Sequence, residues 1–386
     1  MAAKKNRTNG TKKMSELEIH SSPIEVQGLA SISKNVKESV VTINSRNELR
    51  FLVDQYYQAQ SYRIAADNQI RSIKQGYDTS DSEEEIPSAL EWVSKNLTNQ
   101  EAQIKSMLDY YTDSVPVGRW LKATIGIGPV IAAGLIAYFD VSKTSHATQF
   151  WSYAGLNDNN VPWLGKEKGK KILETALTNC GINPKTIKDK SEIPRQVIVE
   201  VSRLSGRGVP FITRNSRNEN GVIDKEHLLK HLVMPPYNRN LKVLCYKIGE
   251  SFVKVSGKPD SLYGELFQEY KESEMEKNAN LEFKEQAEAA LKEKNYAKST
   301  DAYKYYSKGM LPPAHINARA KRAVVKMFIS HLFDAMYIDY YHREPPVPYV
   351  IEFKNHTDVI LPEVPYEEYI DCNNLLPRKQ STIDHI

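Results

Sequence analysis

The chain has 386 residues and a mass of 44.0 kDa, which is room for two or three domains and a sizeable core. Hydrophobic residues make up 40% and charged residues 26%, so collagen-like, disulfide-rich and wholly disordered chains are excluded. A formal net charge of +4 is too small to indicate a polyanionic partner unless the charges are clustered. Three widely spaced cysteines without a Cys-x-x-Cys motif exclude a cysteine zinc module and fit a reducing compartment.

No apolar stretch reaches the length needed to cross a bilayer. The basic start, MAAKKNRTNGTKK, lacks the apolar core of a secretory signal. We therefore expect a cytoplasmic protein, associated with the nucleoid if it binds DNA, and no membrane partner.

Residues 1–43 begin with a basic segment without acids and are predicted to be a disordered tail. Over 44–113, apolar residues recur at spacings of three and four, which predicts a helical hairpin or coiled coil. Such a hairpin offers a surface for a homodimer. Its turn carries the acidic run Glu83 to Glu85, which we expect to be exposed.

Residues 114–156 contain the most informative pattern. The sequence Gly-Ile-Gly-Pro at 126–129 interrupts a short helix and precedes one rich in small residues, which predicts a helix-hairpin-helix. Unpaired N–H groups at such a turn, together with the helix dipole, favour a phosphate. Gly126, Ile127 and Gly128 would donate, and Lys122 would add a charge. The alternative is a close turn in which the glycines permit packing and bind nothing.

Residues 157–236 show weak periodicity and are rich in Gly, Asn, Lys and Arg, which predicts an irregular basic insertion. A lysine cluster at its start would track a nucleic-acid backbone or form a solvated surface. The cluster consists of Lys166, Lys168, Lys170 and Lys171.

Helical periodicity returns over 237–342, and residues 343–386 are predicted to be an extended, proline-rich tail. In the last long helix, Arg319, Arg322 and Lys326 share one side. That basic face either lies along phosphates or meets water. With no convincing alternating strands, the predicted fold class is mainly α.

Enzymatic motifs are missing from the sequence. It has no Walker lysine loop, no HExxH and no GxSxG. His315, His331 and His342 are spaced too loosely for a metal site. We expect no metal and no cofactor.

The stretch TIGIGPVIAAGLIAYFD, followed by ATQFWSYAGL, resembles the C-terminal domain of RNA-guided insertion-sequence transposases of the IS-one-ten type. The resemblance implies DNA binding in transposition or DNA recombination, a mobile-element or phage origin, and a guide RNA as a partner. Two features depart from it. That family has an N-terminal RuvC-like domain with acidic metal ligands, whereas residues 1–113 predict a tail and helices. Its loop serine also has no counterpart, because no serine occurs between Ser152 and Ser191.

We therefore expect a transposase-like protein that binds nucleic acid, DNA rather than RNA, and that lacks the catalytic residues. Two alternatives remain open at this point. One is a divergent active transposase or recombinase, and the other is a helical scaffold without a nucleic-acid role.

Overall fold

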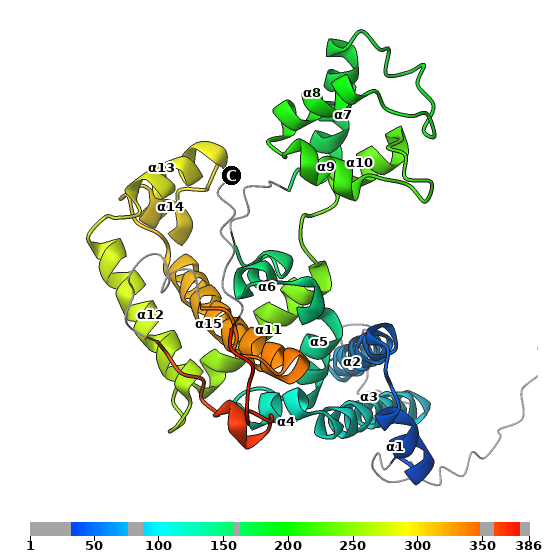
Figure 1. Ribbon diagram of the computed structural model, residues 1–386. Coiled ribbons are helices and arrows are strands. Elements are labelled where there is room, and N and C mark those ends of the chain that lie inside the picture. The colour runs from blue at the N-terminus through cyan, green and yellow to red at the C-terminus, as the bar shows by residue number, and fades with distance from the viewer. Residues whose placement is uncertain (1–31, 76–87, 158–162, 348–358, 379–386) are drawn as a thin grey trace, which may run out of the picture. The chain divides into compact units, whose positions relative to one another are not determined.

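The computed structural model describes residues 32–75, 88–157, 163–347 and 359–378. These residues form fifteen α-helices, two short 3-10 helices and isolated β-bridges, but no strand (Figure 1). The prediction of a mainly α fold is confirmed. Among the described residues, no helix combines the length and the apolar character that crossing a membrane requires.

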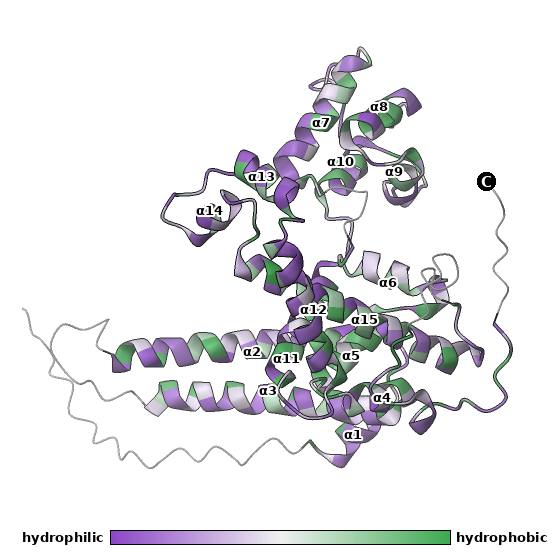
Figure 2. Cartoon of the chain, turned by 90° about the vertical axis from the view of Figure 1, so that its left-hand side faces the viewer, coloured by the Kyte–Doolittle hydropathy of each residue, from purple (hydrophilic) through white to green (hydrophobic). Residues whose placement is uncertain are grey.

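The chain divides into two compact units. Two long helices, α2 (Arg46–Lys74) and α3 (Ser88–Ser114), run through both. The described part of the first unit, residues 54–106, consists of their outer portions, which lie side by side (Figure 2). Helices were predicted over this stretch. The expected acidic turn at Glu83 to Glu85 lies outside the described residues.

Polar contacts join the two helices in the first unit. Glu101 accepts hydrogen bonds from Arg63 Nε at 2.6 Å and from Gln60 Nε2 at 2.9 Å. Asp67 accepts one from Ser94 Oγ at 2.6 Å. The buried apolar residues of this described stretch are Ala59 and Ile104, so polar pairs make up a large part of the contact between the two helices.

The second unit begins with α1 (Lys34–Val41), where Ser33 Oγ accepts from the Val36 N–H at the helix start. This helix lies inside the stretch predicted to be a disordered tail, so that prediction is wrong for Lys34–Val41. Residues 1–31 lie outside the described part.

The main core of the second unit surrounds α15 (Pro313–Tyr341). Its partners are α11 (Arg239–Val255), α12 (Leu262–Ala279), α6 (Ala147–Tyr153) and α4 (Pro116–Ala123). Rings fill the centre: Trp120 stacks parallel to Phe328, and Phe252 stacks on Tyr263. These rings fix α4, α11 and α12 around one helix.

Helix α5 (Pro129–Tyr138) is apolar on all sides, and seven of its ten residues are buried. It packs against α4 and α11, and the 3-10 helix η1 (Val141–Lys143) follows it. Gly134 permits the close approach, since a Cβ there would lie 2.8 Å from Leu244. The predicted helix, turn and small-residue helix over 114–156 therefore occur where the sequence indicated.

The basic stretch 157–236 folds into four helices, and the prediction that it is irregular is wrong. They are α7 (Gly165–Asn179), α8 (Arg195–Ser205), α9 (Val209–Asn215) and α10 (Lys225–Val233). Their apolar residues form a hydrophobic cluster separate from the main core. The helices are short and their sequence is rich in glycine and charge, which weakened the periodic signal.

Two smaller elements complete the described chain. Helices α13 (Lys284–Glu293) and α14 (Asp301–Tyr306) enclose a small apolar cluster of their own. Residues 359–378, within the predicted extended tail, contain the 3-10 helix η2 (Tyr366–Glu368) and pack on the main core. Trp120 Nε1 donates to the Val364 carbonyl at 2.8 Å, and His331 Nε2 pairs with the Ile360 carbonyl at 2.9 Å.

Candidate nucleic-acid interface

The inner side of the hairpin turn is bonded within the protein. Gly126 has a positive φ of 96°, and its carbonyl accepts from Ser251 Oγ at 2.5 Å. The Ile127 N–H donates to the Thr124 carbonyl at 3.1 Å, and the Ile127 side chain is buried. Ile127, which we expected to donate to a phosphate, therefore already has an internal acceptor.

A carboxylate from the C-terminal segment occupies a neighbouring amide of the same turn. Glu363 Oε1 accepts from the Ile125 N–H at 2.5 Å. Burial raises the pKa of Glu363, and the amides of Ile125, Leu262 and Tyr263 oppose that shift. A carboxyl group of the chain itself therefore occupies one amide of the hairpin, so that N–H group is not available to a phosphate.

The outer side of the turn is open. Gly128 is the N-cap of α5, no side chain of the described part of the chain caps that helix, and Pro129 is its first residue. A Cβ added at Gly128 would meet nothing within 4 Å. The first N–H groups of a helix have no intrahelical acceptor, so this end of α5 is the part of the predicted hairpin site that geometry leaves available.

Lys122 is held by two carboxylates. Its Nζ lies 2.5 Å from Asp109 Oδ1 and 2.6 Å from Asp113 Oδ1. Burial alone would lower the pKa of Lys122, but the hydrogen bonds to both aspartates outweigh it and raise the pKa. The side chain ties α4 to the end of α3, and its charge is already balanced.

The cations predicted on α15 have different surroundings. Arg319 bonds Glu274 of α12 and stacks on the Phe283 ring. Lys326 is half-buried over the Trp151 ring, 5.6 Å from its centre. Arg322 is exposed and has no carboxylate within 4 Å among the described residues. The three share one helix, but one of them is bound to a carboxylate.

The four lysines of α7 are exposed. The apolar residues of the helix face the second hydrophobic cluster on its other side. Lys170 lies 3.9 Å from Glu174, whereas within the described chain Lys166, Lys168 and Lys171 have no carboxylate within 4 Å. They occupy the first half of the helix, where the dipole disfavours positive charge. This is the least compensated group of predicted cations.

Other arginines of the same region act within the fold. Arg207 is buried, and its Nη1 donates to the His231 carbonyl at the end of α10 at 2.8 Å. Arg203 pairs with Glu200 at 2.6 Å, and Arg217 Nη1 donates to the Gly221 carbonyl. Counting basic residues along this stretch therefore overstates its free positive charge.

Three cations that were not predicted from the sequence as site residues lie near Asp140. Arg46 lies 3.0 Å from Asp140 and Lys143 lies 3.2 Å from it. Arg50 Nε donates to the Ala137 carbonyl at 2.9 Å. Arg46 and Arg50 are i and i+4 at the start of α2. The sequence pattern that could have indicated these cations is the same as on α7, namely positive charges at the N-terminus of a helix, where the dipole disfavours them.

Within the described residues, no group of three or more His, Cys, Asp or Glu side chains is placed to hold a metal ion. His331 is buried between Tyr263, whose hydroxyl lies 2.7 Å from its Nδ1, and the Ile360 carbonyl. Burial lowers the pKa of His331 to about 4. This histidine is a neutral core residue with both ring nitrogens engaged.

Comparison of the chain with protein-family models, with curated proteins and with solved structures found no match.

Proposed function

We propose that this protein binds nucleic acid, DNA rather than RNA, as a transposase-like protein of a mobile element or phage. It contacts phosphates through the exposed lysines of α7 and through the N–H groups at the start of α5. The preference for DNA rests on the sequence resemblance around the hairpin turn.

This proposal rests mainly on the exposure of the α7 lysines and on the small number of carboxylates near them. Lys166, Lys168 and Lys171 project from the first half of a helix without a nearby carboxylate in the described structure. Cations in the first turn of a helix reduce its stability by about 0.3–1 kcal/mol each, and Lys166 and Lys168 lie in that turn. When lysines bind a polyanion, the release of condensed counterions from its phosphates favours the complex.

The uncapped start of α5 supports the same interpretation. Gly128 leaves open space beside the first turn, and among the described residues no side chain caps its N–H groups. Contacts of this kind go to phosphate oxygens and carry no base specificity. We therefore expect binding that depends weakly on sequence.

The test is binding of the full chain to labelled duplex DNA, single-stranded DNA and structured RNA over a series of salt concentrations. We expect DNA affinity that falls linearly with the logarithm of salt concentration. Absence of binding to all three at low salt would refute the proposed function. Tighter binding to the RNA than to either DNA would refute the preference for DNA.

A further inference from the structure

Two adjoining cavities form one cleft where the start of α2 meets the end of α5. The first, of about 440 Å³, is lined by Arg46, Arg50, Asp140 and Lys143, and otherwise by uncharged side chains. The second, of about 710 Å³, shares Arg50, Asp140 and Lys143 with it. We call the two together the α2–α5 cleft. Each of the two volumes is in the range of small-ligand sites, roughly 300–1,000 Å³.

The α2–α5 cleft has an excess of positive charge. Its described lining holds four cations, the fourth being Arg214 of α9, against Asp140 as the one anion, a net of +3. Asp140 is shared by Arg46 and Lys143. Burial would raise the pKa of Asp140, but hydrogen bonds from Ser142 and Lys143 and the charge of Arg46 lower it. One carboxylate between two cations leaves positive charge for an anionic ligand.

Aromatic side chains line the same cleft. Tyr153 of α6 is 42% exposed, and Asn238 Nδ2 donates to its hydroxyl at 3.0 Å, which holds the ring in place. Phe211 of α9 also lines the cavity, and the stacked rings of Phe139 and Phe150 lie buried behind it. Guanidinium and ammonium groups bind phosphate, and an exposed ring stacks on a base.

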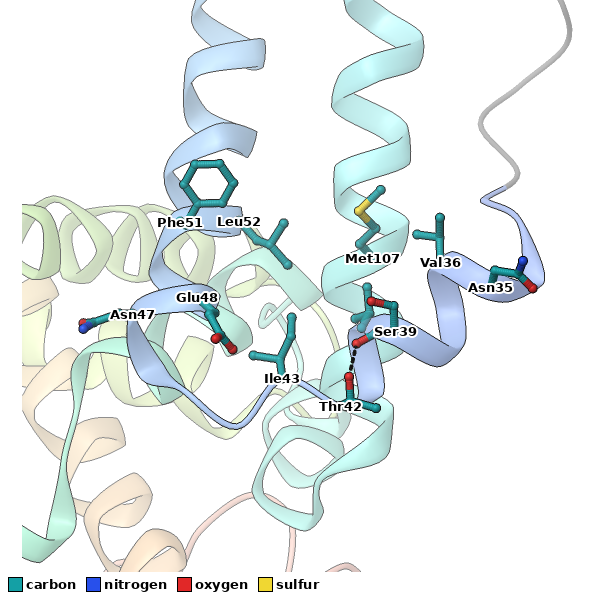
Figure 3. A pocket seen from close by; sticks show the side chains of 11 residues that line it. Asn35, Val36, Ser39, Thr42, Ile43, Asn47, Glu48, Phe51, Leu52 and Met107 are labelled. Atoms are coloured by element: carbon teal, nitrogen blue, oxygen red, sulfur yellow. Dashed lines mark hydrogen bonds between the residues drawn. The ribbon is translucent and has the colours of Figure 1, made fainter.

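Another cavity of the same unit, larger than either of these two, has a different chemistry. It lies beside α1, has a volume of about 870 Å³ and is lined largely by apolar side chains such as Phe51, Leu52 and Met107 (Figure 3). Its charged lining residue is Glu48. A phosphate would be repelled there, so size alone does not identify the site, whereas the α2–α5 cleft combines cations with an exposed ring.

We propose that the α2–α5 cleft binds one unstacked nucleotide of a single-stranded segment, with its phosphate on Arg46 and Lys143 and its base on Tyr153. This inference rests on the proposed function and refines it. A base inside a duplex has both faces covered by its neighbours, so it cannot stack on Tyr153. The cleft therefore gives the protein a preference for single-stranded or locally unpaired DNA, which the α7 lysines do not supply.

The first test replaces the ring. Full-length wild type, Tyr153→Ala, Tyr153→Phe and the control Tyr62→Ala are titrated by fluorescence anisotropy with a labelled oligothymidylate and with a duplex of equal length. Tyr62 is likewise an exposed tyrosine, and it lies in the other unit. Because stacking contributes about 1–3 kcal/mol per base, we expect Tyr153→Ala to weaken single-strand binding by about 5- to 150-fold and duplex binding by less than about twofold. Tyr153→Phe keeps the stacking ring and loses only the hydrogen bond to Asn238, so it should lose much less affinity than Tyr153→Ala.

The second test replaces a cation without touching the core. Lys143→Gln is compared with Lys304→Gln, because each lysine pairs with an aspartate three residues earlier. Loss of one phosphate contact should lower the salt slope for the oligothymidylate by about 0.7 in Lys143→Gln and leave Lys304→Gln unchanged.

The outcomes separate the two proposals. If the wild type binds no nucleic acid, the proposed function fails. If the wild type binds, but Tyr153→Ala behaves as Tyr62→Ala, the cleft inference alone is wrong. Equal losses on duplex and single strand in Tyr153→Ala would also overturn the inference, because the ring would then serve no single-strand preference.

Discussion

Neutralising the α7 lysines should remove most of the salt dependence of DNA binding. The variant changes Lys166, Lys168, Lys170 and Lys171 together to Gln, which keeps the long side chains and the helix propensity. If each lysine contacts a phosphate, four contacts at about 0.9 each give a slope of about 3.6 in log affinity against log salt for duplex DNA. A slope of about 3.6 corresponds to a roughly 150-fold loss of affinity when the salt concentration rises from 50 to 200 mM. The variant should not show this part of the loss.

The matched control is a second quadruple variant, Lys292, Lys294, Lys298 and Lys304 to Gln. These lysines are also exposed, and, as on α7, one of the four has a carboxylate within 4 Å. Both variants lower the net charge by the same amount, so a general charge effect would appear equally in both. Fluorescence anisotropy with a labelled duplex over the salt series measures each slope. Equal slopes in the two variants would refute the assignment of α7.

The same lysines make an opposite prediction for stability. Lys166 lies in the first turn of α7, so Lys166→Gln removes an unfavourable interaction with the helix dipole of about 0.3–1 kcal/mol. Amide hydrogen exchange of α7 in the free protein should slow accordingly. If Lys166 served the fold alone, its substitution would make the protein less stable. If Lys166 binds DNA, the substituted protein should be more stable and should bind DNA more weakly.

Three further predictions concern buried groups and the uncapped helix. Burial raises the pKa of Asp334 to about 7, so the folded state holds this proton and stability falls as pH rises from about 4 to about 7. Asp334→Asn should therefore be more stable than wild type by about 2–4 kcal/mol at about pH 8 and by little at about pH 4 in urea unfolding. The pKa of His331, lowered by burial to about 4, implies stability that is lost as pH falls from about 6.5 to about 4. Tyr263→Phe, which removes the hydroxyl partner of His331, should cost about 1–3 kcal/mol in the same assay at neutral pH. Gly128→Ser should stabilise α5, because Gly128 already has extended N-cap backbone angles (φ −94°, ψ 173°) and serine adds a capping hydroxyl. If a phosphate uses those N–H groups, Gly128→Ser should bind duplex DNA more weakly, and unchanged affinity would contradict that contact.

Local patterns were enough to predict helices over 44–113 and a turn at 126–129 between two helices. The glycines at 126 and 128 and the proline at 129 restrict the backbone within a few residues, and the turn occurs there. The same reasoning failed for 157–236, because its short helices are stabilised by a shared apolar cluster that no single window of sequence reveals. Helix propensity is a property of one segment, whereas the hydrophobic cluster depends on the packing of four helices.

The candidate site was harder to predict because pairing is a property of the folded chain. Lys122 meets Asp109 and Asp113 across a helix junction, and Arg319 meets Glu274 across 45 residues of sequence. Neither separation is a helical i, i+4 spacing, so no periodic pattern indicates it. Asp140 pairs with Lys143 at a local spacing of three residues, but its contact with Arg46 spans 94 residues and no local spacing indicates it.

A cation is evidence for a polyanionic ligand only when the fold leaves its charge uncompensated. By that criterion the predicted residues separate: Lys122 and Arg319 hold helices together, whereas Lys166, Lys168 and Lys171 have no carboxylate within 4 Å in the described chain. The α2–α5 cleft lies between these cases, because one carboxylate there is shared by two cations and an exposed ring stands beside them. Exposed lysines that line no cavity, such as those of α7, suit the uniform phosphate backbone of a nucleic acid. Charge combined with an aromatic face suits a single nucleotide, so the two surfaces are expected to contribute separately to binding.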